Sequence, residues 1–189
     1  MLNGDGLRVV LWLSGCSHNC YKCQNPQTHD PNSGILFDEK AEEELFRELS
    51  KDYISGLTLT GGDPLHENNL DGVLHLVDRF RLLSGDKNIW LYTGYKLIID
   101  YSESKRQRKT VFTLLPYANT NVVNDINEYR RLCGNDDKRR MIAESVDFIV
   151  DGRYIDEQRD VSLKYRGSKN QRVILIKESL KKGEIVTIE

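Results

Sequence analysis

The sequence predicts an α/β fold built on a mostly parallel β-sheet. Short β-favouring apolar runs alternate with stretches of helical spacing along the 189 residues, which is the pattern of repeated βα units. Hydrophobic residues make up 39% and charged residues 30%, with 14 Gly and 4 Pro, so collagen-like, low-complexity and disordered chains are excluded. The length suits a single domain over residues 1–189.

The first elements follow from local patterns. Residues 7–13 form a continuous apolar run, and they predict a buried strand that ends before Gly15. Residues 24–37 contain Pro, Asn and Gly, which favour a loop. Asp38 is a good helix N-cap, and apolar residues at helical spacing continue from it through Ser50.

The later elements repeat this alternation. Residues 56–60 predict a second strand, and apolar residues three and four apart predict a helix over 67–83. The same criteria predict further strands at residues 88–92, 146–150 and 172–176, with 184–188 able to pair with the last of them.

Residues 98–145 form the least regular part of the chain. They contain a short apolar piece at 111–115, a helical pattern at 122–133 and two basic clusters. Basic runs of this kind more often form a solvated face than a nucleic-acid contact. We therefore expect an insertion at about 98–145 within the single domain.

The charge balance excludes several classes of partner. With 27 basic and 29 acidic residues the net charge is −2, which gives no overall attraction to nucleic acid or to an anionic membrane. The longest apolar run, Val9 to Leu13, is far shorter than the roughly 20 residues of a membrane helix. The N-terminus lacks the pattern of a signal peptide. We expect a cytoplasmic protein.

Three of the four cysteines fall within one short segment, at Cys16, Cys20 and Cys23. In a reducing cytosol such a cluster indicates a metal site rather than a disulfide framework. The Cys-x3-Cys-x2-Cys spacing fits an iron–sulfur cube in which each thiolate holds one iron. The fourth iron would then have no protein ligand and could bind a substrate or cofactor.

Zinc is the alternative metal for this loop. Its fourth ligand would be Cys133, His18 or His29. Zinc sites usually pair two short cysteine knuckles, and the sequence contains no second knuckle. The pattern therefore favours iron–sulfur ligation, and the two histidines are more typical of ordinary loop residues.

The cysteine loop and three glycine-containing turns come directly after predicted strands. Because the carboxyl ends of parallel strands meet at one edge of a sheet, which is where βα folds bind ligands, these turns should be neighbours in space. They are the cysteine loop after the first strand, Gly61-Gly62-Asp63 after the second, Thr93-Gly94 after the third and Asp151-Gly152 after the fourth.

The glycine turn can bind a ligand beside that metal. Gly61 and Gly62 have no Cβ, so backbone can approach a ligand closely. Carbonyls at the strand end can accept hydrogen bonds from an ammonium group, and Asp63 adds a carboxylate. Next to an open iron, this predicts a cofactor with an amino-acid head. Alone, Gly-Gly-Asp-Pro is equally typical of a plain β-turn.

The cysteine loop and the glycine turn resemble the motifs of the radical S-adenosylmethionine superfamily. More closely, the chain resembles the family of activating proteins of anaerobic (class III) ribonucleoside-triphosphate reductases. The stretches that carry this resemblance are Asn3-Gly4-x-Gly6, Ser14-Gly15-Cys16-x-His18, residues 57–65 and 89–96, Val150-Asp151-Gly152-Arg153-Tyr154 and Arg166-Gly167-Ser168-x-Asn170-Gln171.

The resemblance implies an incomplete (βα) barrel with a [4Fe-4S] cluster and S-adenosylmethionine. Reductive cleavage of the cofactor would give a 5′-deoxyadenosyl radical, which would abstract hydrogen from a glycine of the partner reductase. A one-electron donor such as flavodoxin would supply the electron, and no side chain is required as a catalytic acid or base. The implied cluster ligands are Cys16, Cys20 and Cys23; the implied cofactor contacts are the backbone at Lys22 and Gln24 against the adenine, the backbone around Gly61, Gly62 and Asp63 at the ammonium, and Thr93 and Gly94.

Two alternatives stay open at this point. One is a radical enzyme of the same superfamily that acts on a small molecule, as the deazaguanine-forming synthases do. The other is a zinc-stabilised binding module. Anaerobic reconstitution with iron and sulfide separates the second from the others, because only a radical enzyme would then cleave S-adenosylmethionine.

Overall fold

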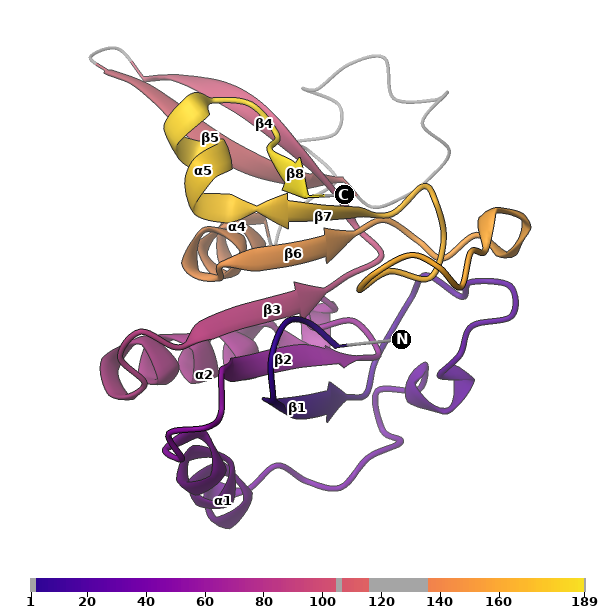
Figure 1. Ribbon diagram of the computed structural model, residues 1–189, viewed down its shortest axis with the longest axis vertical. Helices are drawn as coiled ribbons and strands as arrows, with labels where there is room; N and C mark the ends of the chain where they lie inside the picture. Colours follow the sequence, from indigo (N-terminus) through magenta and orange to yellow (C-terminus); the bar gives the residue numbers. More distant parts are fainter. Residues whose placement is uncertain (1–2, 105–106, 116–135, 189) are drawn as a thin grey trace.

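A six-stranded sheet forms the centre of the computed structural model, which describes residues 3–104, 107–115 and 136–188 (Figure 1). Its strand order is β1-β2-β3-β6-β7-β8. The strands are β1 (Arg8–Leu13), β2 (Gly56–Gly61), β3 (Asn88–Tyr92), β6 (Phe148–Asp151), β7 (Arg172–Leu175) and β8 (Thr187–Ile188).

Strands β1, β2, β3 and β6 run parallel, whereas β7 is antiparallel to β6 and β8 to β7. The sheet is therefore mixed, mostly parallel and open, which confirms the predicted α/β class. The expected pairing of the last residues with β7 is also confirmed, since Val173 faces Ile188 in the register. The parallel arrangement brings the ends of four strands to one edge (Figure 1).

The first two helices of the chain form where the sequence predicts them, whereas the last two were not predicted. Asp38 caps α1 (Glu39–Leu49), its Oδ1 accepting a hydrogen bond of 2.9 Å from the backbone N–H of Ala41. The remaining helices are α2 (Leu70–Leu83), α4 (Asp136–Ser145) and α5 (Ile176–Lys182), with short 3-10 turns η1 (Pro26–Thr28), η2 (Glu67–Asn69) and η3 (Asp156–Gln158).

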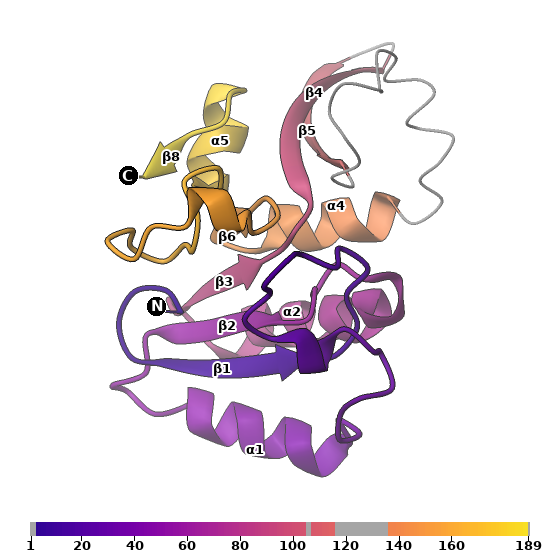
Figure 2. The same ribbon diagram turned by 90° about the vertical axis from the view of Figure 1, so that its right-hand side faces the viewer.

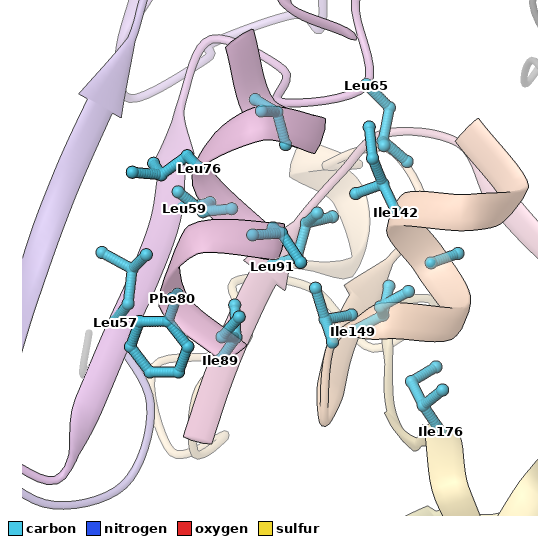
Figure 3. Close-up of a cluster of buried hydrophobic side chains, with 14 of the residues drawn as sticks. Leu57, Leu59, Leu65, Leu76, Phe80, Ile89, Leu91, Ile142, Ile149 and Ile176 are labelled. Carbon is cyan, nitrogen blue, oxygen red and sulfur yellow. The ribbon is translucent and has the colours of Figure 1, made fainter. Parts of the chain in front are cut away.

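The main core lies between these helices and one face of the sheet (Figure 3). Alternate strand residues such as Leu57 and Leu59 point to this face, as expected from the two-residue period of a strand. They pack against Phe80 of α2 and Ile142 of α4, all of them buried. Each such side chain contributes about 1.5–3 kcal/mol through burial, so the core fixes the positions of the strand ends.

The other face of the sheet is less covered. A small cluster forms around Trp90, whose ring stacks on Phe148 with centroids 4.5 Å apart. At the edge of the sheet, Trp12 of β1 is 51% exposed. The prediction of a buried first strand is therefore wrong: among the described strands β1 pairs only with β2, and its residues are half-buried or exposed.

The region expected to be an insertion contains a second sheet. Strands β4 (Lys96–Ser104) and β5 (Gln107–Leu115) pair antiparallel, with Lys96 opposite Leu115. Figure 2 shows this hairpin rising from the main sheet beside α4. β4 was not predicted because its apolar run, residues 97–99, is short and is followed by the mostly polar residues 100–104. The helical pattern at 122–133 and Cys133 lie outside the described residues.

Within the described ranges, no helix is both long and apolar enough to cross a membrane.

Candidate functional site

An open pocket lies at the edge where the parallel strands end. Turns after β1, β2, β3 and β6 all contribute to its wall, which confirms their predicted proximity. The predicted site residues that line it are Cys16, Cys20, Cys23, Gln24, Gly61, Gly62, Asp63, Thr93 and Gly94, joined by Gly152 of the fourth predicted turn and by His29, the alternative zinc ligand; the further lining residues include Asn25, Tyr92, Arg153, Tyr154, Gly167 and Gln171.

The cysteine loop is closed at its base by backbone hydrogen bonds. The N–H of Gly15 donates to the carbonyl of Thr28 at 2.8 Å, and the N–H of Cys16 donates to the carbonyl of His29 at 3.0 Å. Within the loop, Asn19 and Lys22 adopt positive φ angles of 47° and 53°. These left-handed residues turn the chain tightly enough to direct three cysteines toward one pocket.

The three cysteines line the same pocket. Each is a free, half-buried thiol. A cubane cluster takes one thiolate for each of three irons, which matches the number of cysteines in this loop. Burial raises the pKa of the Cys16 thiol to about 11, so a thiolate there requires a metal beside it.

The two histidines named as alternative zinc ligands differ in their surroundings. His18 Nε2 lies 2.6 Å from Asp63 Oδ2, so this nitrogen is already occupied. His29 Nε2 is buried and has no hydrogen-bond partner among the described residues, and its ring belongs to the pocket wall. A bound group in the pocket would supply the partner that this nitrogen lacks.

The two glycines of the turn bring backbone segments together. A Cβ on Gly61, whose φ is +103°, would lie 2.7 Å from the carbonyl oxygen of Leu13. A Cβ on Gly62 would lie 2.5 Å from the carbonyl oxygen of Gly15 and 2.9 Å from that of Thr28. These glycines therefore have a structural role in addition to the predicted approach to a ligand. They are required because the turn packs directly on β1 and the cysteine loop.

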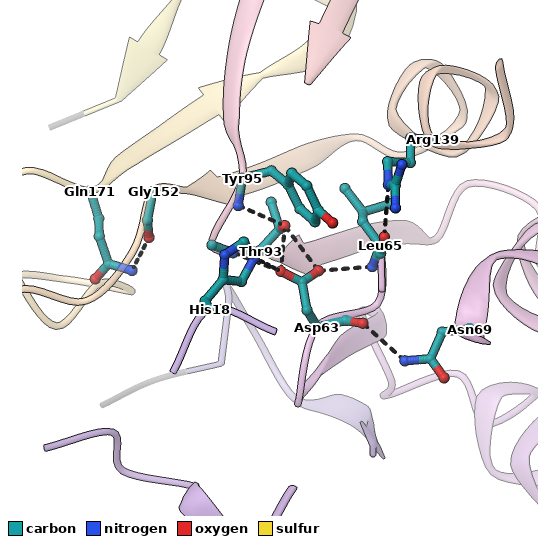
Figure 4. A network of polar contacts seen from close by, with 10 residues as sticks. His18, Asp63, Leu65, Asn69, Thr93, Tyr95, Arg139, Gly152 and Gln171 are labelled. Atoms are coloured by element: carbon teal, nitrogen blue, oxygen red, sulfur yellow. Dashed lines mark hydrogen bonds and ion pairs between the residues drawn. The ribbon is translucent and has the colours of Figure 1, made fainter. Parts of the chain in front are cut away.

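Asp63 is the centre of a buried hydrogen-bond network (Figure 4). Its side chain is 1% exposed. Oδ1 accepts from Leu65 N at 2.8 Å and Thr93 Oγ1 at 2.9 Å, and Oδ2 pairs with His18 and accepts from Gly94 N at 2.9 Å. Burial opposes ionisation, but these donors outweigh it and lower the pKa of the carboxyl below its usual value. The carboxylate is thus occupied by protein donors and fixes the turn, whereas the cofactor contact through the backbone around Asp63 stays a prediction.

Thr93 and Gly94 complete this network from the end of β3. The hydroxyl of Thr93 also accepts from the backbone N–H of Tyr95 at 3.1 Å. A Cβ on Gly94 would lie 2.4 Å from Cδ2 of His18, so only glycine leaves space for the imidazole. Both residues line the pocket, but their donor groups face Asp63.

Of the two predicted adenine contacts, one lines the pocket and the other does not. Gln24 is exposed and lines the pocket. Lys22 is not among the pocket residues; its Nζ binds Asp156 Oδ2 at 2.7 Å, and Tyr154 Oη donates to Asp156 Oδ1 at 2.8 Å. This contact fastens the cysteine loop to η3.

The far wall of the pocket is the segment that follows β6; the sequence predicted its first turn at this edge but not the hydrogen bonds that hold the wall together. Gln171 holds this wall together: Oε1 accepts from Gly167 N at 2.9 Å, and Nε2 donates to the carbonyl of Gly152 at 3.0 Å. Asn170 Nδ2 donates to the carbonyl of Arg153 at 2.7 Å. The signal was present, because Gly152 follows a predicted strand at the same edge as the cysteines.

Comparisons with known proteins agree with this geometry. A family model described as a 4Fe-4S single cluster domain matches residues 2–174. The chain is 35% identical over 173 residues to the anaerobic ribonucleoside-triphosphate reductase-activating protein of Haemophilus influenzae, covering 90% of this chain and 89% of that one. It is 34% identical to the protein of this name from enterobacteria phage T4, over 91% and 86% of the two chains. The Escherichia coli K12 protein is 31% identical, over 90% of both chains. No solved structure matches.

Proposed function

Because the chain belongs to the family of anaerobic ribonucleoside-triphosphate reductase-activating proteins, with a 4Fe-4S single cluster domain, we propose that it generates a glycyl radical on an anaerobic ribonucleotide reductase. The observation that carries the proposal is the convergence of three free cysteines and the Gly-Gly turn on one pocket. A structural metal site would not need a ligand turn beside it.

In this proposal Cys16, Cys20 and Cys23 hold the [4Fe-4S] cluster, one thiolate to each of three irons. When bound, the reduced cluster and S-adenosylmethionine supply the electron transfer and the radical that removes hydrogen from a glycine of the partner. The backbone of Gly61 and Gly62 is the candidate contact for the amino-acid head of the cofactor, because it adjoins the cysteine loop. Gln24 is a candidate contact for the adenine.

The chain's own residues position the cofactor rather than move protons. The Asp63 network fixes the turns after β2 and β3 to the cysteine loop. The Gln171 network shapes the opposite wall and narrows the access of water. We further propose that the open, mostly parallel sheet is an incomplete barrel of the radical S-adenosylmethionine type, and that the reaction takes place in the cytoplasm with a flavodoxin as electron donor.

The open pocket suits a glycine presented on a loop of another protein, because such a loop would complete the site and exclude water. Strand ends and the segment after β6 surround the entrance. A small-molecule substrate would instead have to be enclosed by this chain alone.

The test is anaerobic reconstitution with iron and sulfide, followed by incubation with dithionite or reduced flavodoxin, S-adenosylmethionine and the cognate reductase. We expect an electron paramagnetic resonance doublet on the reductase, with release of 5′-deoxyadenosine and methionine. Cofactor cleavage without a doublet would favour the small-molecule enzyme. A protein that takes up zinc but forms no iron–sulfur cluster would reject both.

A further inference from the structure

His18 occupies a position between the two elements on which the proposed site depends. It lies within the cysteine loop, between Cys16 and Cys20, and its side chain is 7% exposed. The imidazole does not point to solvent: Nε2 lies 2.6 Å from Asp63 Oδ2, in the turn after β2 (Figure 4). A polar side chain in a loop is rarely buried to this extent without a structural reason.

The ring also contacts the end of a third strand. It packs edge-on against Tyr95, with centroids 4.8 Å apart, and lies directly over the Cα of Gly94. One imidazole therefore touches the turns after β2 and β3 while its backbone belongs to the loop after β1. The loop after β1 carries the three cysteines, and the turn after β2, Gly61-Gly62-Asp63, is the proposed contact of the cofactor.

The cysteine loop has few other attachments to the turn Gly61-Gly62-Asp63. At its base, Asp63 N donates to the carbonyl of Gly15 at 2.8 Å, and this bond involves backbone only. Beyond the base, the Lys22–Asp156 pair fastens the loop to the opposite wall. At the base, Asn69 Nδ2 also donates to the carbonyls of Ser14 and Asp63, at 2.9 Å each. Between the base and Lys22, His18 supplies the side-chain link from the loop to the turn.

Asp63 does not depend on His18 for its own position. Thr93, Gly94 and Leu65 donate to its carboxylate independently. Removal of the imidazole should therefore leave the turn folded and free only the middle of the cysteine loop. The cluster and the cofactor would then no longer be held at a fixed separation.

We infer that His18 is a positioning residue, which sets the cluster relative to bound S-adenosylmethionine without ligating either group. The inference rests on the proposed function, since it concerns the cluster and cofactor of that site. Three cysteines suffice to hold the cluster. The loss of His18 should therefore weaken the response of the cluster to bound S-adenosylmethionine more than it lowers the iron content.

The experiment compares three variants with the reconstituted parent. His18→Phe keeps an aromatic ring and removes the N–H, His18→Gln restores a donor, and Gly94→Ala displaces the ring without changing His18. His75→Phe is the matched control, because that histidine is 65% exposed on α2. The readouts are iron content, unfolding temperature of the metal-free protein, the effect of S-adenosylmethionine on the spectrum of the reduced cluster, and KM and kcat for cofactor cleavage.

We expect His18→Phe to load iron like the parent, to lose most of the spectral response to S-adenosylmethionine and to show a KM raised about tenfold or more, the scale of one lost charge-assisted hydrogen bond. Gly94→Ala should behave in the same way, and His18→Gln should recover part of the response. His75→Phe should match the parent.

A spectral response and KM equal to the parent's in both His18→Phe and Gly94→Ala would overturn the inference. So would loss of iron in His18→Phe at an unchanged metal-free unfolding temperature, because His18 would then serve the cluster itself. A parent that responds to S-adenosylmethionine but forms no glycyl radical counts against the proposed function instead, and the comparison of the variants still decides the role of His18.

Discussion

Gly62 lies so close to Gly15 that a Cβ on Gly62 would stand 2.5 Å from the carbonyl oxygen of Gly15. The N–H of the next residue, Asp63, donates to the same carbonyl at 2.8 Å. The turn after β2 and the base of the cysteine loop are thus one packed unit. A change in the turn must therefore affect the loop that carries the proposed cluster ligands.

The first prediction concerns this contact. Gly62→Ala should lower both iron loading and the affinity for S-adenosylmethionine, because backbone of Gly15 and Thr28 fills the space that the methyl group needs. Iron content after reconstitution and cofactor binding by equilibrium dialysis measure the two effects. Gly72→Ala is the control: nothing lies within 4 Å of a Cβ there, and helix propensity should stabilise the protein by about 0.5–1 kcal/mol. Normal iron loading in Gly62→Ala would show that the turn and the loop move independently.

The second prediction concerns the ligands. Replacing Cys16, Cys20 or Cys23 by Ala should each abolish the cluster, since two thiolates are too few to retain it. Iron and sulfide analysis with the visible absorption spectrum gives the readout. Cys133→Ala should keep the parent's iron content, because Cys133 falls outside the motif. If iron were lost in Cys133→Ala, the set of three ligands would be incomplete.

A third prediction uses Asp147, which lies away from the pocket. The carboxylate accepts from Ile89 N at 2.8 Å and binds Arg81 at 2.7 Å and Lys177 at 2.8 Å. Burial opposes its charge, but these donors outweigh burial and hold the pKa of the carboxyl below its usual value. A lowered folded-state pKa gives stability that is present above the unfolded-state pKa of about 3.9 and lost as pH falls through the folded-state value.

Asp147→Asn should accordingly lower the free energy of unfolding by about 1–3 kcal/mol at pH 7, the scale for a group that leaves charged partners unsatisfied. The difference from the parent should shrink as the pH falls below about 4. Urea unfolding of the metal-free proteins at several pH values measures it. Asp71→Asn is the matched control, because that side chain is 82% exposed and its pair with Lys138 lies at the surface. An equal loss at pH 7 and at pH 3 would contradict the electrostatic explanation.

The sequence was sufficient for the parts of the fold that depend on local patterns. Asp38 marked the start of α1, and the turns after β1, β2 and β3 carried the residues that line the pocket. Parallel pairing then placed those turns together, because strand direction follows from the βα connections.

Two features of the structure could not be predicted from local sequence patterns. The exposed position of Trp12 depends on β1 being an edge strand, and strand order is a property of the whole sheet. The role of Asp63 depends on partners 45 and 30 residues away, His18 and Thr93. A carboxylate beside a ligand turn looks the same in sequence whether it faces the ligand or supports the turn from inside.

The last prediction concerns the wall after β6, whose hydrogen bonds the sequence did not predict. Gln171 accepts from Gly167 N and donates to the carbonyl of Gly152, so its amide closes the segment after β6 into a fixed shape. Gln171→Leu has similar size but leaves both backbone groups without this partner, at a cost of about 1–3 kcal/mol for each group that stays buried. We expect the wall to open, the affinity for S-adenosylmethionine to fall about tenfold or more and iron loading to stay at the parent's level, because the cysteines lie on the opposite wall. Gln158→Leu, at an exposed position in η3, should change neither quantity. Cofactor affinity equal to the parent's in Gln171→Leu would remove this wall from the cofactor site and leave the cysteine loop and the glycine turn as its only protein contacts among the described residues.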